Sequence, residues 1–376
     1  MNATLAVVRP FHSLQTVHAL RNNGISTTIF SSAPRKYYSN LPGDVQYHLI
    51  PSPVDVLEKV LRCSFPGNLA KRSALFWDYL VARSMATSDA VIGYAAQSYF
   101  ISAAAVKQGS RFVLDRACPY VDFQQQLIRE EAERNEVSYS VLPEWCREHQ
   151  YVEYERASAI LVPSTYTASS FPAELQHKLV IAPLMGRVRH FADSARERNK
   201  VFTLGIVGGQ ILRKGYLYLF EAWRRLALPN ARLLVRCSDQ FENFPRISKL
   251  LKETPGIEVV GYVNDMKDFY AQCDAFILSS TDDGFGMALL EAAGMGAACI
   301  ATTHCGASDL FNDHEDALVI KPRSVEAIME AVEFLYSNEE VRLRLANAGL
   351  MTARRVAGED RYARGVMRAV QGNFAV

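Results

Sequence analysis

Two series of short apolar runs constrain the fold of this 376-residue chain more than any other feature. The first series lies at residues 5–8, 27–30, 90–92, 112–114, 160–162 and 179–181, and the second at 203–207, 233–235, 258–260, 275–278, 299–301 and 318–320. Runs this short, bounded by Gly, Pro, Asn or Asp and separated by helix-length amphipathic segments, are typical of buried strands in parallel sheets. The sequence therefore predicts an α/β fold with two consecutive, doubly wound, Rossmann-like domains.

The break between the two series falls near Pro183, and the chain is long enough for two cores. The domains are predicted at residues 1–184 and 185–350, followed by a C-terminal helix within 351–376. That helix has Tyr362, Val366 and Val370 on one side and is expected to pack back towards the first domain. Because open parallel sheets bind ligands at the carboxyl ends of their strands, two facing sheets predict a cleft between the domains.

Charge and cysteine content narrow the class of protein. The net charge is +1, from 41 basic and 40 acidic residues, which does not favour nucleic acid as a partner. The seven cysteines form no Cys-x-x-Cys, and they are interpreted as reduced thiols of a cytoplasmic protein. No leader-like N-terminus and no apolar run of about 20 residues is present. Basic and apolar residues at 59–62, 65 and 71–77 allow peripheral contact with the inner face of a membrane, although core-facing helices explain them as well.

Residues 283–291, Asp-Gly-Phe-Gly-Met-Ala-Leu-Leu-Glu, place two carboxylates around a glycine turn. The turn follows an apolar run and leads into an apolar helix, whose first N–H groups attract an anion. Asp283 would lie in the turn and Glu291 about two helical turns further on. One acid could then reach sugar hydroxyls and the other ribose hydroxyls, with a diphosphate between them. On this motif alone, an ordinary loop with Asp283 as a helix cap remains an alternative.

A second glycine turn, Val-Gly-Gly-Gln-Ile-Leu-Arg-Lys-Gly at 207–215, opens the second domain. Gly208 and Gly209 let an anion approach the backbone, and Arg213 or Lys214 would neutralise phosphate charge. The run is not a P-loop, and it lacks the Gly-x-Gly-x-x-Gly of nicotinamide enzymes. A tight turn before a solvated helix start is an equally good interpretation of this stretch by itself.

With the segments 261–263 and 303–310, these elements resemble the retaining GT-B glycosyltransferases of family 4 (glycosyl transferases group 1), most strongly over 202–322. The resemblance implies that Lys214 binds the donor diphosphate, Glu291 the ribose and Asp283 the transferred sugar. The remaining predicted donor-binding residues are Gly208, Gly209, Arg213, Tyr262, Val263, Gly284, Phe285, Gly286 and Met287. Gly306 and Asp309 stand where many members have Gly and Glu.

The chain departs from the family pattern at three places. Many members carry Arg at the position of Gly209 and Glu at that of Asp283, and a histidine is expected near Tyr120. Arg213 could substitute for the Arg that is missing at position 209. The shorter Asp283 suggests a shifted or different sugar, or reduced activity.

The acceptor side is expected in the first domain. His12, Tyr94, Arg116 and Tyr120 are the candidates, since they follow predicted strands, and Asp115 joins Lys214 and Asp283 as a predicted catalytic residue. A local ion pair is an equally good interpretation of Asp115 and Arg116, and a lone loop histidine is more often exposed or capping a helix.

The absence of Asp-x-Asp, His-Glu-x-x-His and Cys-x-x-Cys predicts no metal and no cofactor. The resemblance implies retaining, metal-independent transfer of a hexosyl or deoxyhexosyl group from a nucleotide sugar to a carbohydrate or lipid-linked glycan, in cell-surface polysaccharide or glycoconjugate biosynthesis. Two alternatives remain. One is another nucleotide-sugar enzyme on the same scaffold, such as an epimerase or phosphorylase, and the other is a degenerate, non-catalytic protein that binds a nucleotide sugar or a partner.

Overall fold

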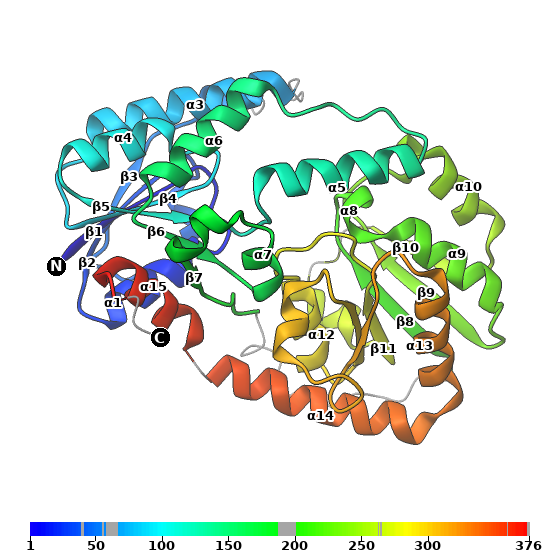
Figure 1. The fold of residues 1–376 in the computed structure, drawn as a ribbon. Coiled ribbons are helices and arrows are strands. Elements are labelled where there is room, and N and C mark those ends of the chain that lie inside the picture. The colour runs from blue at the N-terminus through cyan, green and yellow to red at the C-terminus, as the bar shows by residue number, and fades with distance from the viewer. Residues whose placement is uncertain are drawn as a thin grey trace.

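The computed structural model describes residues 1–38, 41–54, 56–57, 67–186, 201–261, 263, 265–358 and 360–373. Two parallel sheets with helices on their faces stand side by side in this part of the chain (Figure 1). The first sheet is built from residues before Pro183 and the second from residues after 200. The predicted α/β architecture of two doubly wound sheets is confirmed.

The first sheet has seven strands within the described residues, in the order β3-β2-β1-β4-β5-β6-β7. Their bounds are β1 Asn2–Val7, β2 Ser26–Ser31, β3 Gln46–Leu49, β4 Ala90–Tyr94, β5 Arg111–Asp115, β6 Ala159–Val162 and β7 Leu179–Ile181. Every neighbouring pair is parallel. The strand order reverses between β1 and β4, which is the place where such sheets bind ligands.

The second sheet has six described strands, in the order β10-β9-β8-β11-β12-β13. Their bounds are β8 Phe202–Val207, β9 Ala231–Arg236, β10 Ile257–Val260, β11 Ala275–Leu278, β12 Ala298–Thr302 and β13 Leu318–Ile320. All pairs are again parallel. Here the order reverses between β8 and β11, so the loops after these two strands meet at one edge of the sheet.

Helices cover both faces of each sheet (Figure 1). Those of the first half are α1 Ser13–Asn22, α3 Gly67–Ser84, α4 Tyr99–Lys107, α5 Val121–Arg134, α6 Glu144–Arg156 and α7 Thr165–Ser169. Those of the second half are α8 Ile211–Lys214, α9 Tyr216–Leu226, α10 Pro245–Glu253, α11 Met266–Tyr270, α12 Met287–Gly294, α13 Val325–Ser337, α14 Glu339–Gly358 and α15 Arg361–Gln371. Short 3₁₀ helices lie at η1 Arg35–Tyr38, η2 Ala173–Lys178, η4 Phe241–Asn243 and η5 Gly306–Leu310.

The last two helices link the two halves of the molecule. α14 packs against α12 and β12 of the second sheet, whereas α15 packs against α1 and beside β6 of the first (Figure 1). Tyr362, Val366 and Val370 are at most 2% exposed, as their spacing predicted. The hydroxyl of Tyr362 lies 2.7 Å from Oγ1 of Thr16, so the C-terminal helix completes the core of the first domain.

Helix α5 crosses between the halves in the other direction. It follows β5 in the first domain, yet it contacts α8 of the second. Glu131, which is 1% exposed, lies 2.7 Å from Nε of Arg323 and accepts a hydrogen bond from the hydroxyl of Tyr218. The two domains therefore share buried polar contacts as well as a chain crossing.

Candidate functional site

The glycine turn after β8 brings Lys214 to the edge of the second sheet. Gly208 has φ of 147°, and a Cβ atom there would lie 2.7 Å from Cε of Lys214, so the lysine side chain runs across this glycine. Gly215 has φ of 69°, and its Cβ would lie 2.0 Å from the carbonyl oxygen of Ser279. Both positions require glycine. The lack of a side chain at Gly215 lets the turn lie directly against the chain that follows β11.

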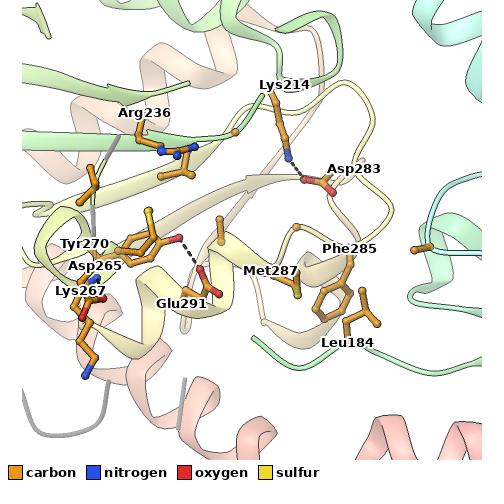
Figure 2. A pocket seen from close by; sticks show the side chains of 17 residues that line it. Leu184, Lys214, Arg236, Asp265, Lys267, Tyr270, Asp283, Phe285, Met287 and Glu291 are labelled. Carbon is orange, nitrogen blue, oxygen red and sulfur yellow. Dashed lines mark hydrogen bonds and ion pairs between the residues drawn. The ribbon is translucent and has the colours of Figure 1, made fainter. Parts of the chain in front are cut away.

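The residues after β11 supply the partner of Lys214. The ammonium group of Lys214 forms an ion pair with Oδ2 of Asp283, and both side chains are more than four-fifths buried (Figure 2). The N–H of Asp283 donates to the carbonyl of His304, and its own carbonyl accepts from Gly306. The two motifs that the sequence singled out thus meet at the reversal of strand order.

A cavity of 810 Å³ opens at this edge, between the two halves of the chain (Figure 2). The predicted donor residues that line it are Gly208, Lys214, Val263, Asp283, Phe285, Gly286, Met287 and Glu291. Ala117 and Leu184 contribute from the first half. Gly209, Arg213 and Gly284 do not line it, and Tyr262 lies outside the described residues.

The N-terminal end of α12 forms a wall of this cavity whose N–H groups are suited to an anion, and we call it the anion-binding wall. Gly286 has φ of 83°, and its Cβ would lie 2.6 Å from Sγ of Cys305. The N–H groups of Phe285, Gly286 and Met287 donate no hydrogen bond to any part of the chain that the structure describes. Free N–H groups at a helix start, with the positive end of the helix dipole, stabilise a phosphate or an oxyanion.

Glu291 lies on the opposite side of the cavity from Asp283 (Figure 2). The hydroxyl of Tyr270 donates to its Oε2 over 2.8 Å. Burial, followed by the nearby Glu291 carboxylate, raises the pKa of Tyr270 well above its ordinary value, so the phenol stays protonated. Tyr270 thereby helps to fix the orientation of the Glu291 carboxylate at the wall of the cavity.

The turn at residues 283–286 is also held by the first domain. The carbonyl oxygen of Gly284 accepts hydrogen bonds from Ser164 (2.7 Å) and Thr167 (3.0 Å). A Cβ at Gly284 would lie only 2.1 Å from the carbonyl oxygen of Ala117. The position of the anion-binding wall therefore depends on contact between the domains.

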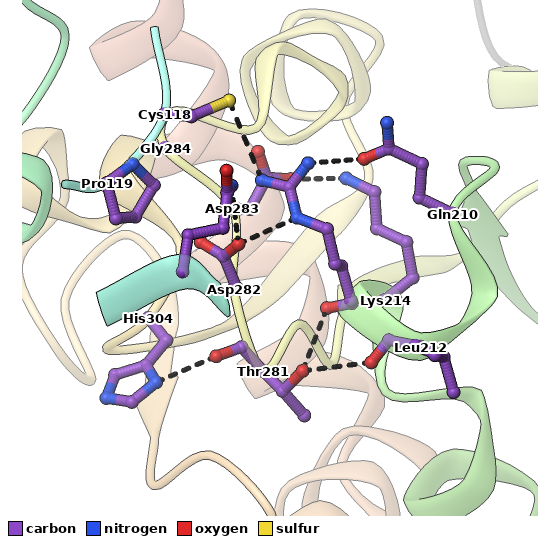
Figure 3. Close-up of polar contacts among 12 residues, drawn as sticks. Cys118, Pro119, Gln210, Leu212, Lys214, Thr281, Asp282, Asp283, Gly284 and His304 are labelled. Atoms are coloured by element: carbon purple, nitrogen blue, oxygen red, sulfur yellow. Dashed lines mark hydrogen bonds and ion pairs between the residues drawn. The ribbon is translucent and has the colours of Figure 1, made fainter. Parts of the chain in front are cut away.

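Arg213, the neighbour of Lys214, does not line the cavity, and its side chain contacts Asp282 instead. Its Nε donates to Oδ2 of Asp282 over 2.7 Å, and its guanidinium also contacts Gln210 (Figure 3). Asp282 accepts further hydrogen bonds from Gln124 (3.0 Å) and Tyr166 (3.4 Å) of the first domain. The charge of Arg213 is thus used in a polar contact between the domains, beside the cavity.

Three of the predicted acceptor-side and catalytic residues, His12, Tyr94 and Asp115, form a cluster at the carboxyl ends of the strands of the first sheet. Nε2 of His12 lies 2.7 Å from Oδ2 of Asp115, and the ring of Tyr94 packs 5.3 Å from that of His12. The hydroxyl of Tyr362 lies 3.4 Å from the same carboxylate oxygen. All are buried and none lines the 810 Å³ cavity.

Arg116 and Tyr120 shape the chain after β5. The guanidinium of Arg116 donates to the carbonyl oxygens of Cys118 and Pro119 and to Oε1 of Gln150. The ring of Tyr120 packs against those of Tyr151, Tyr154 and Phe171. The structure brings neither side chain to the cavity; Ala117, between them, is the residue of this segment that reaches it.

Sequence reasoning missed several residues of the site, of which Arg236, Asp265, Lys267 and Tyr270 carry polar groups. Arg236 ends β9, directly beside the end of β8. A cation at the carboxyl end of a strand was a signal that could have identified it, because neighbouring parallel strands end at the same edge. Tyr270 gave no such signal, since its role depends on how α11 packs against α12.

A smaller cavity of 260 Å³ lies within the first domain, among α3, α4 and α6. Asp78 and Glu153 line it, and both carboxylates already accept backbone hydrogen bonds, from Phe100 and Ile101 and from Ala96 and Ser98. Burial raises the pKa of Asp78 to about 7 and, with a further contribution from Asp78, that of Glu153 to about 8. These groups hold the start of α4 and the loop before it.

These raised pKa values predict that stability falls as the pH rises. The folded state binds the two protons more tightly than the unfolded state, so the contribution of these two groups to the free energy of unfolding is largest below the ordinary carboxyl pKa values and is lost as the pH rises to about 8. Each group contributes roughly 1 kcal/mol per pH unit within its window. Urea unfolding at pH 5, 6.5 and 8 measures this slope. Glu153→Gln should flatten it and the exposed Glu133→Gln should not; equal slopes in both variants and the wild type would contradict the assignment.

The described residues contain neither a cluster of metal ligands nor a membrane-spanning helix. No group of three or more His, Cys, Asp or Glu in them converges as metal ligands would. None of their helices combines the length and the apolar character needed to cross a bilayer. Trp77, one of the residues considered for membrane contact, is fully buried, and its indole N–H donates to the carbonyl of Ile50. Residues 59–62 and 65 lie outside the described part.

Comparisons with known proteins show which sequences and folds the chain resembles. Residues 189–350 match the family model described as glycosyl transferases group 1. A lipopolysaccharide core biosynthesis glycosyltransferase, LpsE of Rhizobium meliloti, is 27% identical over 144 residues, which cover 38% of this chain and 42% of that protein. The matched region thus spans about two fifths of the length of this curated relative.

Solved structures match over the whole chain and show its fold. A sucrose-phosphate synthase from Thermosynechococcus elongatus superposes with a TM-score of 0.73 at 15% identity, covering 99% of this chain and 98% of that one. The Anabaena protein HepE, solved in complex with UDP and glucose, superposes with a TM-score of 0.65 at 12% identity, covering 99% and 98%. The chain has the GT-B fold, and it resembles glycosyl transferases group 1.

Proposed function

We propose that this GT-B chain, whose residues 189–350 match glycosyl transferases group 1, transfers a sugar from a nucleotide sugar to a hydroxyl group of a carbohydrate or lipid-linked glycan. The observation that carries the proposal is the cavity at the strand-order reversal of the second sheet. It combines the free N–H groups at the start of α12, the ammonium group of Lys214 and a carboxylate fixed by Tyr270.

Each part of the cavity has a role in this reaction. Lys214 and the N–H groups of Phe285, Gly286 and Met287 bind the diphosphate and stabilise the negative charge that grows on it as the sugar departs. Glu291 accepts hydrogen bonds from the ribose hydroxyls. Asp283, released from Lys214 when the diphosphate binds, accepts hydrogen bonds from the transferred sugar.

The finer assignments follow from the resemblance. The transfer is proposed to retain the anomeric configuration, with attack on the face that the diphosphate leaves, so no enzyme nucleophile is required. It is proposed to need no metal, since Lys214 and backbone N–H groups supply the charge. LpsE acts in lipopolysaccharide core biosynthesis by its name, which supports an acceptor in cell-surface glycan assembly. We further propose a cytoplasmic site of action that allows contact with the inner face of a membrane.

Donor binding and turnover test the proposal separately. Isothermal titration with a panel of UDP-, GDP-, ADP-, CDP- and dTDP-sugars identifies the nucleotide that binds. Release of the nucleoside diphosphate in the presence of glycan acceptors then shows transfer. Binding that saturates without any release would favour the non-catalytic alternative. Two features support that alternative: Gly209 replaces the usual Arg, and Lys214 forms an ion pair with Asp283. Failure to bind any of the panel would contradict the proposal.

Removing the Glu291 carboxylate is expected to weaken donor binding. Glu291→Ala should raise the Kd of the nucleotide sugar by about 10- to 100-fold, because a hydrogen bond to a charged group contributes roughly 1.5–3 kcal/mol. Tyr270→Phe removes the hydroxyl that orients Glu291 and should cost about tenfold or less. Glu258→Ala, at a carboxylate on β10 that pairs with Arg232, is the matched control and should bind as the wild type does. Unchanged affinity in a folded Glu291→Ala protein would remove Glu291 from the site.

A further inference from the structure

We propose that Arg236 is a second diphosphate-binding cation of this site, acting beside Lys214; this inference rests on the proposed function. Arg236 is the last residue of β9, and its side chain lines the 810 Å³ cavity. Figure 2 shows Arg236 on the same side of the cavity as Lys214, across from the Tyr270–Glu291 pair. A diphosphate that joins a ribose at Glu291 to a sugar at Asp283 would lie in the cavity that Arg236 lines.

The hydrogen bonding of Arg236 distinguishes it from the other cations nearby. Lys214 is paired with Asp283, and Arg213 with Asp282. By contrast, Nε of Arg236 is buried and has no hydrogen-bond partner among the residues that the structure describes. A buried donor without a partner is unfavourable, and a turn of the side chain that brings this N–H group to an anion in the cavity would satisfy it. A guanidinium can also hold two phosphate oxygens at once.

The charges that line the cavity lead to the same assignment. They comprise three acids, Asp265, Asp283 and Glu291, and three cations, Lys214, Arg236 and Lys267. A diphosphate carries more than one negative charge, whereas Lys214 supplies one positive charge and stands beside the carboxylate of Asp283, so a further cation is needed. Lys267 lies on α11, next to the helix-capping Asp265, and Figure 2 places both far from Lys214. Of Arg236 and Lys267, Arg236 is the one drawn nearer to Lys214 in Figure 2.

The local backbone explains why the second cation comes from β9. A Cβ at Gly209 would lie 2.3 Å from Oγ of Ser238 and 2.8 Å from Oδ1 of Asp239. Asp239 is itself fixed there, because its Oδ2 accepts the N–H of Gln210 over 2.6 Å. The turn that begins after Arg236 therefore occupies the space that a side chain at residue 209 would need. The N–H of Gly208 donates to the carbonyl of Arg236, so the two positions are adjacent across the sheet.

Titration of the purified full chain tests this assignment. The probes are the nucleoside diphosphate that the wild type binds most tightly, among UDP, GDP, ADP, CDP and dTDP, and the corresponding nucleoside. R236M, which removes the charge at similar length, should weaken diphosphate binding by about 10- to 100-fold and leave nucleoside binding within about twofold. R236K, which keeps the charge but loses the fork, should fall between R236M and the wild type.

A matched control lies on the same strand. Arg232 pairs with Glu258 and does not line the cavity, so R232M should bind the diphosphate as the wild type does. Diphosphate binding by R236M equal to that of the wild type would overturn the inference, and so would an equal loss of diphosphate and nucleoside binding. If R236M does not fold, R236K replaces it in the test. A selective loss of diphosphate affinity in R236K would then support the inference, and an unchanged ratio of diphosphate to nucleoside affinity would overturn it. A wild type that binds none of the diphosphates overturns the proposed function and this inference with it.

Discussion

Replacing Lys214 by methionine is expected to lower kcat by about 10²- to 10³-fold, the usual cost of removing one group that stabilises charge in a transition state. The ammonium group lies at the cavity edge, where the diphosphate would depart. Its loss also leaves the carboxylate of Asp283, which is 14% exposed, without its partner and next to that developing negative charge. Steady-state release of nucleoside diphosphate, with saturating donor and acceptor, measures the effect.

Two further variants show whether the loss arises from this site. Lys249→Met removes an exposed lysine of α10 that pairs with Glu253, and it should leave kcat unchanged. In Lys214→Met/Asp283→Asn the unpaired carboxylate is gone as well, so we expect diphosphate affinity to recover in part while turnover stays low. A Lys214→Met enzyme with wild-type kcat would show that the ion pair serves the fold alone.

A single methyl group at Gly284 is expected to lower activity by about 100-fold or more and to reduce Tm. The added Cβ would lie 2.1 Å from the carbonyl oxygen of Ala117 and 2.9 Å from its carbonyl carbon, and backbone atoms cannot rotate away. The turn at residues 283–286 must then move away from the first domain. Asp283 and the free N–H groups move with it, and a displacement of about 1 Å in such groups can cost about 100-fold.

Gly43→Ala is the control for this prediction. An added Cβ at residue 43 meets no heavy atom within 4 Å, and the backbone there is not in the left-handed region. Activity and Tm should both stay close to those of the wild type. If Gly284→Ala keeps full activity, the contact with Ala117 is not needed to position the turn.

The strands were predictable because both sheets are parallel and buried on both faces. All residues of β4, β11 and β12 are buried, and the sequence shows them as continuous apolar runs. Strand β3 was missed for the opposite reason. Gln46–Leu49 is an edge strand with mostly exposed side chains, so it carries no apolar run. Only its pairing with β2 makes it a strand.

The site was predictable where strand order alone decides the geometry. Lys214 and Asp283 follow β8 and β11, and these strands are neighbours at the reversal of strand order. The sequence could not show which of Arg213 and Lys214 faces the cavity, since adjacent residues of a short helix point in different directions. Nor could it show that Asp115, at the end of β5, is covered by Tyr362 from a helix at the far end of the chain.

That C-terminal helix also sets the order in which the two domains can finish folding. Tyr362 lies 247 positions after Asp115, and synthesis at about 5–20 residues per second separates them by roughly 10–50 s. During this interval the whole second domain emerges from the ribosome, while the surface of the first domain that receives α15 remains uncovered. The domain made first is therefore completed last, and a nascent chain has a long period in which α1 and the His12–Asp115 pair lack their final covering.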